Sequence, residues 1–393
     1  DRVARVASPP PSAVALPAAT PVTDQLLHTV MRVMRHQDLE VPLGGSTLDP
    51  AWIPHRALRR SESHWHRRLG AAAYDYEIAP GLLALRAQLA QRLSAGGTPL
   101  AADEITVTGG CLEAISLSLD TCTRPGDAVM VESPTFFGLL QLLQRKGLRV
   151  AGVTLGPGGL SVQAVAAVLD RQPVTAACLT PNFSNPSGAL TPVAEKRAIG
   201  QLLAARRVTL IEDDVYAELS HHGPRPPTMI ALCPQTDVLC CGSVSKVLAP
   251  GLRLGWVARR RGVHGDRFAD LPTAKFVTTL AAPTLAQHVV ADWMQRGLFD
   301  RHLQRLRRQL PARVTAYREA ILEHLPPGTE VSRPDGGFLL WVCLPRTLDP
   351  TWLIAAAQAI GVGLVPGSAF HARAQASPCL RLSAAGALDE RVL

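Results

Sequence analysis

Lysine is scarce in this chain, so arginine supplies almost all of its positive charge. Only four lysines occur among 393 residues, although the formal net charge is +8. The chain also lacks any apolar run near the ~20 residues that a membrane-spanning helix needs, and we therefore expect a soluble protein with no membrane partner. The eight cysteines contain no Cys-x-x-Cys pair. This pattern predicts neither a disulfide framework nor a metal site, and it favours a reducing, cytoplasmic setting.

The first residues lack the apolar segment of a signal peptide. The stretch DRVARVASPPPSAVALPAATP is rich in proline and alanine, which is typical of a linker. The chain stops abruptly at GALDERVL. We therefore expect a fragment of a longer product, with a linker and N-terminal arm over residues 1–40.

The middle of the chain alternates between strand-length apolar runs and helix-length segments. The apolar runs lie at residues 104–110, 127–133, 174–182, 208–216, 237–245 and 254–258. The helix-like segments between them lie at residues 113–122, 136–147, 161–172 and 191–207. Such alternation predicts an α/β fold in which a mostly parallel sheet has helices on both faces. We assign residues 41–290 to this large domain and residues 291–393, where the pattern changes, to a smaller α+β domain.

Two arginine-rich segments, residues 59–69 and 302–313, allow two interpretations. They could form a nucleic-acid-binding face, or they could be the solvated faces of two helices. No helix-turn-helix or zinc-finger spacing accompanies them. The sequence therefore favours the solvated interpretation.

The polar residues that end the apolar runs should meet at one edge of the sheet, where open α/β sheets bind ligands. They include the Gly109–Gly110 turn, Asn182–Asn185, Asp213–Tyr216 and Ser243–Lys246. An amine, a carboxylate and a helix N-terminus that can hold a phosphate are the groups that pyridoxal 5′-phosphate (PLP) requires. The constellation therefore indicates PLP chemistry.

Several motifs then resemble those of class I/II aminotransferases of PLP fold type I. The segment SVSKVLAPGLRLGW is similar to their PLP-lysine motif, PNFSNPSG to their Asn-Pro-x-Gly motif and DDVY to their Asp-x-x-Tyr motif. The segments DYEIAPGLLALR, TGGCLEAI and ESPTFFGLLQ resemble more closely the aminotransferase-like domain of MocR-type regulators, which carry a GntR-type winged helix before a linker. The resemblance implies a seven-stranded sheet in the large domain, and DNA binding only through a winged helix that this chain lacks.

The resemblance also implies a role for each catalytic residue. Lys246 would form the Schiff base and move the substrate proton, and Asp213 would pair with the pyridine nitrogen. Asp214 is the alternative to Asp213, but the spacing to Tyr216 favours Asp213. Tyr216 and Asn185 would hydrogen-bond the cofactor's phenolic oxygen.

The remaining positions would bind the cofactor or the substrate. Phe136 would stack on the ring, and Tyr76, or alternatively Tyr74, would reach the phosphate of the partner in a homodimer with shared active sites. Arg381 would grip the substrate α-carboxylate, with Asn185 and Gly45 as further substrate contacts. The phosphate ligands would be Gly110, Cys111, Leu112, Ser243, Ser245 and Arg253.

Three functions remain open at this point. The chain could be the PLP-binding effector domain of a MocR-type regulator, which the linker-like start favours. It could instead be a stand-alone aminotransferase acting on amino acids and keto acids, or an enzyme that performs another PLP reaction such as a lyase. The motifs establish cofactor binding better than turnover.

Overall fold

The structure is a computed structural model that describes residues 30, 31, 33, 39–95, 97–260, 267–348, 350–372, 377–390 and 392. The linker expected over the first residues lies outside this part of the chain. The helices described are α2 (His55–Leu69), α3 (Leu83–Leu93), α4 (Cys111–Cys122), α5 (Phe137–Arg145), α6 (Val162–Arg171), α7 (Val193–Ala205), α8 (Met229–Leu232), α9 (Leu271–Thr279), α10 (Thr284–Gln295), α11 (Leu298–His324) and α12 (Pro350–Ala359). None of these helices has the length and apolarity needed to cross a membrane.

The central element is a seven-stranded sheet with the strand order β2-β8-β7-β6-β5-β3-β4. Its strands are β2 (Ile105–Thr108), β3 (Ala128–Ser133), β4 (Arg149–Thr154), β5 (Ala176–Leu179), β6 (Thr209–Asp213), β7 (Val238–Ser243) and β8 (Gly255–Arg259). Only β8 runs against its neighbours, so the prediction of a mostly parallel seven-stranded sheet is confirmed. Strand β4 was not among the predicted runs, because at the sheet edge it exposes alternate residues and includes Gly152.

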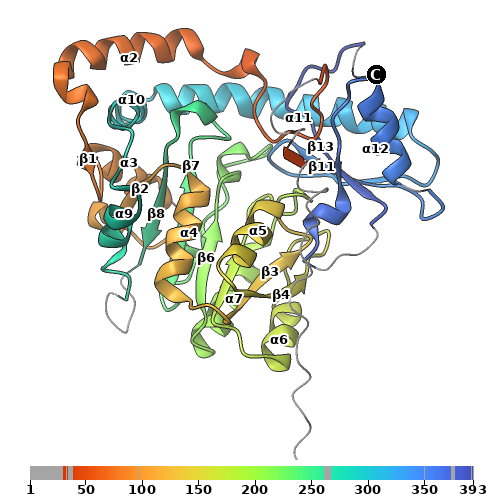
Figure 1. Cartoon of the computed structure of the whole chain (residues 1–393), viewed down its shortest axis with the longest axis horizontal. Helices are drawn as coiled ribbons and strands as arrows, with labels where there is room; N and C mark the ends of the chain where they lie inside the picture. The colour runs from red at the N-terminus through yellow and green to blue at the C-terminus, as the bar shows by residue number, and fades with distance from the viewer. Residues whose placement is uncertain are drawn as a thin grey trace, which may run out of the picture.

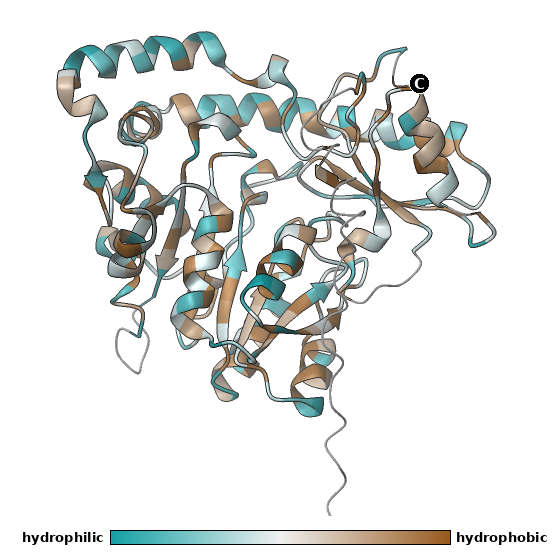
Figure 2. Cartoon of the chain, viewed as in Figure 1, coloured by the Kyte–Doolittle hydropathy of each residue, from teal (hydrophilic) through white to brown (hydrophobic). Residues whose placement is uncertain are grey.

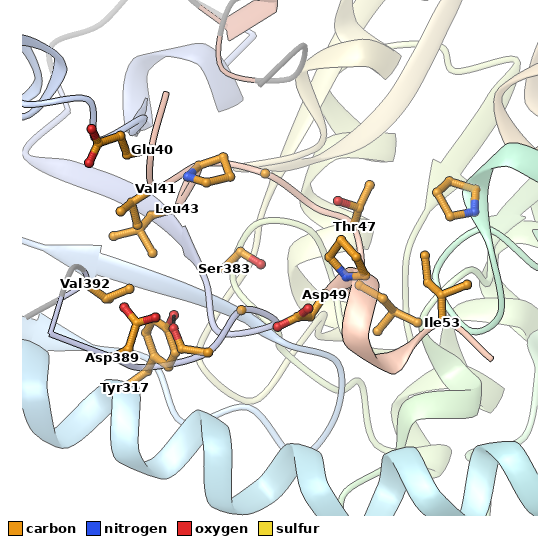
Figure 3. A pocket seen from close by; sticks show the side chains of 17 residues that line it. Glu40, Val41, Leu43, Thr47, Asp49, Ile53, Tyr317, Ser383, Asp389 and Val392 are labelled. Carbon is orange, nitrogen blue, oxygen red and sulfur yellow. Dashed lines mark hydrogen bonds between the residues drawn. The ribbon is translucent and has the colours of Figure 1, made fainter. Parts of the chain in front are cut away.

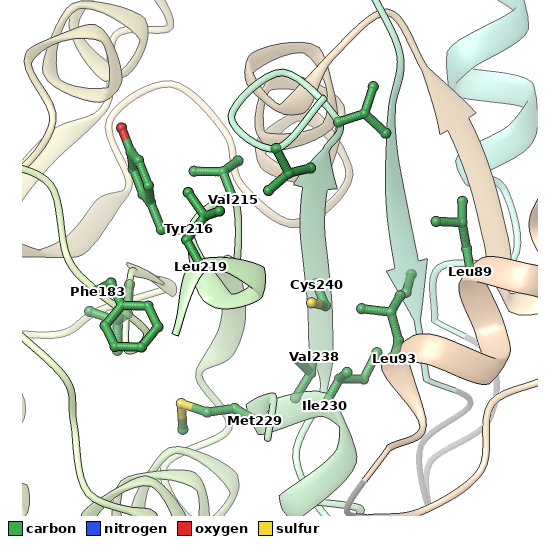
Figure 4. Close-up of a cluster of buried hydrophobic side chains, with 14 of the residues drawn as sticks. Leu89, Leu93, Phe183, Val215, Tyr216, Leu219, Met229, Ile230, Val238 and Cys240 are labelled. Atoms are coloured by element: carbon green, nitrogen blue, oxygen red, sulfur yellow. The ribbon is translucent and has the colours of Figure 1, made fainter. Parts of the chain in front are cut away.

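Both faces of this sheet are covered by helices (Figure 1). Alternate residues of one strand enter different cores: Leu239 and Cys241 of β7 pack with α4, α5 and α9, whereas Val238 and Cys240 pack with α3, α7 and α10. This alternation follows from the two-residue period of a strand. It explains why a central strand such as β7 is apolar on both of its sides. Figure 4 shows part of the second core, with the ring of Tyr216 lying beside Leu219.

A second sheet of four strands has the order β10-β11-β13-β12. Its strands are β10 (Glu330–Val331), β11 (Leu339–Cys343), β12 (Val365–Pro366) and β13 (Cys379–Ser383), and a two-stranded sheet pairs β1 (Glu77–Ile78) with β9 (Ala281–Ala282). Helices α11 and α12 cover the four-stranded sheet with apolar side chains. In Figure 2 these helices carry brown and teal faces, as amphipathic helices should.

One expectation about cysteine is wrong. Cys343 and Cys379 form a disulfide between β11 and β13, where the two residues lie directly opposite each other. They are 36 positions apart in the chain, so only the register of the sheet brings them together. Cysteine spacing could not reveal this pair, and the cysteines therefore no longer argue for a reducing compartment.

Candidate active site

Lys246 follows β7 at the carboxyl edge of the large sheet, and its amine is held by a distant loop. Its Nζ donates hydrogen bonds to the carbonyl oxygen of Ser46 at 2.7 Å and to the Ser46 hydroxyl at 3.1 Å. Burial and, to a smaller extent, the neighbouring charge of Arg381 lower the pKa of Lys246 to about 8, while Asp213 opposes the shift. The amine is therefore partly neutral near physiological pH, as a nucleophile must be.

Asp213 is the last residue of β6, and it is the carboxylate that interacts with Lys246. Burial raises the pKa of Asp213 to about 6, whereas the Lys246 charge lowers it. Its Oδ1 lies 3.5 Å from the Cys111 sulfur and accepts a hydrogen bond from Val215 N at 3.4 Å. Asp213 is thus an anion at neutral pH, with capacity for a further donor.

The alternative carboxylate, Asp214, is engaged elsewhere. It accepts a hydrogen bond at 2.9 Å from Asn182 Nδ2 and forms a buried ion pair with Arg225. Adjacent residues at the end of a strand point in opposite directions, so only one of the two aspartates can face Lys246. The geometry favours Asp213.

Arg381 lies on β13 of the smaller sheet and is completely buried. Its Nη1 donates to Asn185 Oδ1 at 3.1 Å, and its Nη2 donates to the carbonyl oxygen of Gly44. The guanidinium carbon also lies 5.0 Å from the ring centre of Phe370, which stabilises the cation. Burial lowers the pKa of Arg381 to about 10, so the side chain remains charged at neutral pH.

The Gly109–Gly110 turn precedes α4 and contacts Arg253. The Arg253 Nη2 donates to the Gly109 carbonyl oxygen at 2.6 Å. Gly110 has a φ of +129°, and a Cβ at this position would lie 2.7 Å from Arg253 Nη2, so only glycine fits. Helix α4 begins directly afterwards at Cys111, so the N–H groups of its first turn lie beside the Arg253 guanidinium.

The other predicted cofactor residues lie around these elements. Ser243 is buried, and its hydroxyl accepts a hydrogen bond from Ser245 N at 3.2 Å. Phe136 caps the start of α5, and its ring centre lies 4.8 Å from that of Phe137. Leu112 on α4 is 46% exposed, which leaves its side chain free of the core.

The two tyrosines proposed to reach a partner subunit are exposed. Tyr76 is 68% exposed and Tyr74 is 80% exposed. The Tyr74 hydroxyl lies 2.9 Å from His66 Nε2, whereas the Tyr76 hydroxyl makes no hydrogen bond with the described residues. The Tyr76 hydroxyl is therefore available to bind another molecule, whereas the Tyr74 hydroxyl already has a partner.

Gly45 does not supply the contacts at this site; the two residues beside it do. The Gly45 N–H donates to the Pro42 carbonyl at 3.0 Å, while Gly44 binds Arg381 and Ser46 binds Lys246. The expectation that Gly45 contacts the substrate points to this segment, but no motif marks Ser46. This serine is the functional residue that the sequence did not reveal.

A cavity of about 690 Å³ lies between residues 40–53, the long helix α11 and residues 383–392. Figure 3 shows Glu40, Asp49 and Tyr317 at its walls. None of Lys246, Asp213 and Arg381 lines it, so we place the candidate active site at the strand ends instead.

Buried polar atoms at the strand ends fit a polar ligand. Arg381 Nε is buried and makes no hydrogen bond with the described residues, and the buried Tyr216 hydroxyl interacts with Ser46 without a hydrogen bond of ordinary geometry. Burial raises the pKa of Tyr216, with the Arg381 charge opposing, so the hydroxyl keeps its proton to donate. A ligand with oxygen acceptors would satisfy both atoms.

Comparison with known proteins decides the family. The model of aminotransferase class I and II matches residues 67–392. The chain belongs to this aminotransferase family. Its fold is that of the fold-type I PLP enzymes, and PLP is the cofactor that the family indicates.

The most similar relatives include regulators as well as enzymes. The uncharacterized HTH-type transcriptional regulators YjiR and YdcR of Escherichia coli are 33% and 36% identical; the alignments cover 98% and 89% of this chain and 82% and 74% of theirs. The structure of LysN, an α-aminoadipate aminotransferase from Thermus thermophilus with bound N-(5′-phosphopyridoxyl)-L-leucine, is 28% identical with a TM-score of 0.85. That alignment covers 93% of this chain and 92% of LysN.

Proposed function

We propose that this chain is the PLP-binding effector domain of a MocR-type transcriptional regulator, in which Lys246 holds the cofactor and Arg381 holds an amino acid. The observation that carries the proposal is the convergence of three residues on one site: Lys246, which follows β7, interacts electrostatically with Asp213 of β6 and with Arg381 of β13 in the other sheet. The regulators among the relatives support the effector role.

PLP supplies, when bound, an aldehyde that condenses with amines and a ring that accepts electrons from the substrate Cα. The residues of the chain do the rest. Lys246 offers a neutral amine near pH 8 and, once released, can take or return a proton. Asp213 presents an anion where the ring nitrogen would lie, since its remaining lone pairs are free for a charge-assisted hydrogen bond.

Arg381 determines which end of the substrate is held. Its planar guanidinium can give two parallel hydrogen bonds to an α-carboxylate, which a lysine cannot do. One nitrogen, Nε, is already without a partner in the described chain. Asn185 orients the guanidinium through its side-chain oxygen, and Tyr216 offers its hydroxyl to the cofactor.

The phosphate would lie on the N–H groups of Gly110, Cys111 and Leu112, with Ser243, Ser245 and Arg253 as side-chain donors. Phe136 would stack on the ring. Tyr76 would complete the site of the second subunit of a homodimer, which agrees with its exposure. Gly45 is retained only as a main-chain neighbour of the substrate.

The remaining parts of the proposal concern organisation. We divide the chain into an arm at residues 1–40, a large domain at residues 41–290 and a small domain at residues 291–393. DNA recognition would belong to a winged helix upstream of this chain, and the protein would act in the cytoplasm.

The first experiment tests the cofactor site. Lys246→Ala should abolish the cofactor that borohydride fixes to the protein, and Lys146→Ala should not, because Lys146 lies on the surface beside Asp120. Mass spectrometry of the reduced protein gives the result. A cofactor adduct that persists in Lys246→Ala would refute the assignment.

The second experiment separates sensing from turnover. The LysN likeness favours the alternative that the domain is a working aminotransferase. Incubation with an amino-acid panel and a keto-acid acceptor should change the cofactor spectrum without sustained product if the domain is a sensor. Product beyond one equivalent of cofactor would support the enzyme, and ammonia or a side-chain fragment would indicate a lyase.

A further inference from the structure

Helix α2 carries a row of arginines on one side. Arg56, Arg60 and Arg67 are separated by four and seven residues, which places them within about 40° of one another around the helix axis. All three are exposed. At ~1.5 Å per residue the row extends over roughly 17 Å. We call these three residues the α2 arginine row.

The opposite side of α2 is fixed to the protein, so the row cannot turn inward. Leu58 and Ser61 are buried there, and the Ser61 hydroxyl accepts a hydrogen bond at 2.8 Å from Trp293 Nε1 of α10. The Trp65 ring packs 4.9 Å from the His288 ring of the same helix. Figure 1 shows α2 at the upper edge of the molecule, beyond α10.

The charge of the row is not neutralised within the part of the chain that the structure describes. None of the three arginines forms an ion pair there, and Glu62, the single carboxylate of α2, lies on the other side of the helix. Other arginines of this protein behave differently: Arg92 pairs with both Glu218 and Asp300. Three unpaired like charges on one rigid face repel one another unless an anionic partner binds.

We propose that the α2 arginine row binds the phosphate backbone of nucleic acid. Arginine matches phosphate with two parallel hydrogen bonds, and a row of about 17 Å reaches several successive phosphates. Figure 2 shows that α2 is largely hydrophilic. A membrane-binding helix would present large apolar residues beside its charges, and a protein interface would offer an apolar anchor; the exposed side of α2 has neither.

The contact would be independent of base sequence. Phosphate contacts position a protein on a duplex, whereas base contacts in the grooves read the sequence. The row would therefore add affinity to that of a separate sequence-specific DNA-binding domain, and it would orient the effector domain on the DNA. The choice of nucleic acid as the partner rests on the proposed regulatory function, but the row and its charge do not.

The experiment compares two triple variants of the 393-residue chain with equal loss of charge. The test variant replaces Arg56, Arg60 and Arg67 by glutamine. The control variant replaces Arg124, Arg145 and Arg171, which are exposed and follow or end α4, α5 and α6. Binding to a short labelled duplex of random sequence is measured by fluorescence anisotropy over a series of salt concentrations.

The test variant should reduce the slope of log K against log salt by about 2–3, since each phosphate contact contributes ~0.9. This corresponds to binding weaker by on the order of a hundredfold at 0.1 M salt. The control variant should bind as the parent does. Equal DNA binding by the two variants would overturn the proposal. It would also be overturned if the parent bound phosphatidylserine vesicles or polyglutamate as tightly as it binds the duplex.

Folding is checked on the same samples by thermal unfolding and by borohydride fixation of PLP, neither of which should change. If the triple variant does not fold, Arg60→Gln alone should reduce the slope by about 1. If the parent protein binds DNA but borohydride fixes no PLP to it, the proposed function is rejected and the arginine row is not. If borohydride fixes PLP but the test variant binds DNA as the parent does, only the arginine row is rejected.

Discussion

Replacement of Lys275 by methionine should weaken both the fold and the proposed phosphate site, although Lys275 is not one of the residues that we assign to the cofactor or the substrate. Lys275 is buried in α9, and its Nζ donates to Glu113 Oε1 at 2.9 Å and to the Ala281 carbonyl at 3.0 Å. Glu113 lies in the first turn of α4, and its other oxygen accepts a hydrogen bond from Gly109 N. Lys275 thus compensates a carboxylate that fixes the turn before the phosphate site.

The size of the expected loss in stability depends on how far the Lys275–Glu113 pair is exposed to water. Burial alone would raise the pKa of Glu113, but hydrogen bonds from Thr279, Gly109 and Lys275 lower it overall. Removing one partner of a buried ion pair costs about 3–5 kcal/mol. Because the Glu113 side chain is 19% exposed, water can recover part of this loss. We therefore expect a loss of about 2–3 kcal/mol in the free energy of unfolding.

The assay is urea unfolding of the cofactor-free protein at two pH values, together with PLP titration followed by absorbance. A depressed carboxylate pKa stabilises the fold above the carboxylate's unfolded-state pKa, and this stability is lost as the pH falls. The difference between parent and Lys275→Met should therefore persist from pH 7 down to about 4.5, the ordinary pKa of a glutamate, and shrink as the pH falls below it. PLP affinity should also fall, since an uncompensated carboxylate in α4 repels the phosphate.

Two variants make the test specific. Lys146→Met breaks a more exposed ion pair with Asp120, which lies on α4 as Glu113 does, and should cost less than about 1 kcal/mol. Adding Glu113→Gln to Lys275→Met should restore part of the stability, because no unpaired charge remains. Purely additive effects in this double variant, or equal losses for the two lysines, would refute the reasoning.

Three further predictions concern the site itself. Arg381→Lys should weaken amino-acid binding by about 10–100-fold, because a point charge cannot donate to Asn185, Gly44 and a carboxylate in fixed directions; spectral titration of the cofactor-loaded protein measures it. The rate of cofactor capture by Lys246 should rise with pH through about 8, and a stopped-flow midpoint near 10.5 would contradict the assigned burial. In the cofactor-free protein the pKa of Asp213 is raised to about 6, so the free energy of unfolding falls as the pH rises from roughly 4 to 6. The loss amounts to at most about 3 kcal/mol, and Asp213→Asn should remove it. Urea unfolding at each pH measures the difference.

The sheet could be predicted because its strands are buried on both faces. The run at residues 238–242 has no polar side chain, and between helix-length segments this pattern has few interpretations other than a buried strand. Strand β4 escaped because it lies at the edge, where one side meets solvent and the apolar run is broken. The prediction was thus best where burial dictates the residues most strongly.

The strand ends could be located because parallel strands bring their carboxyl ends to one edge. The placement of Asp213 near Lys246 and of the Gly109–Gly110 turn beside Arg253 follows this rule. Ser46 could not be found in the same way. It contacts Lys246 across 200 positions of sequence, and only the packing of an irregular loop brings it there.

The site requires three charges to coexist, and burial alone would not provide them. Burial raises the pKa of Asp213 to about 6 and lowers those of Lys246 and Arg381 to about 8 and about 10. Arg381 survives as a cation because a guanidinium starts from a much higher pKa than an ammonium. Between roughly pH 7 and 9 the site therefore contains an anion, a partly neutral amine and a cation at once. An arginine at position 246 would stay charged and could not act as a nucleophile, whereas a buried lysine at position 381 would lose the charge that a carboxylate needs.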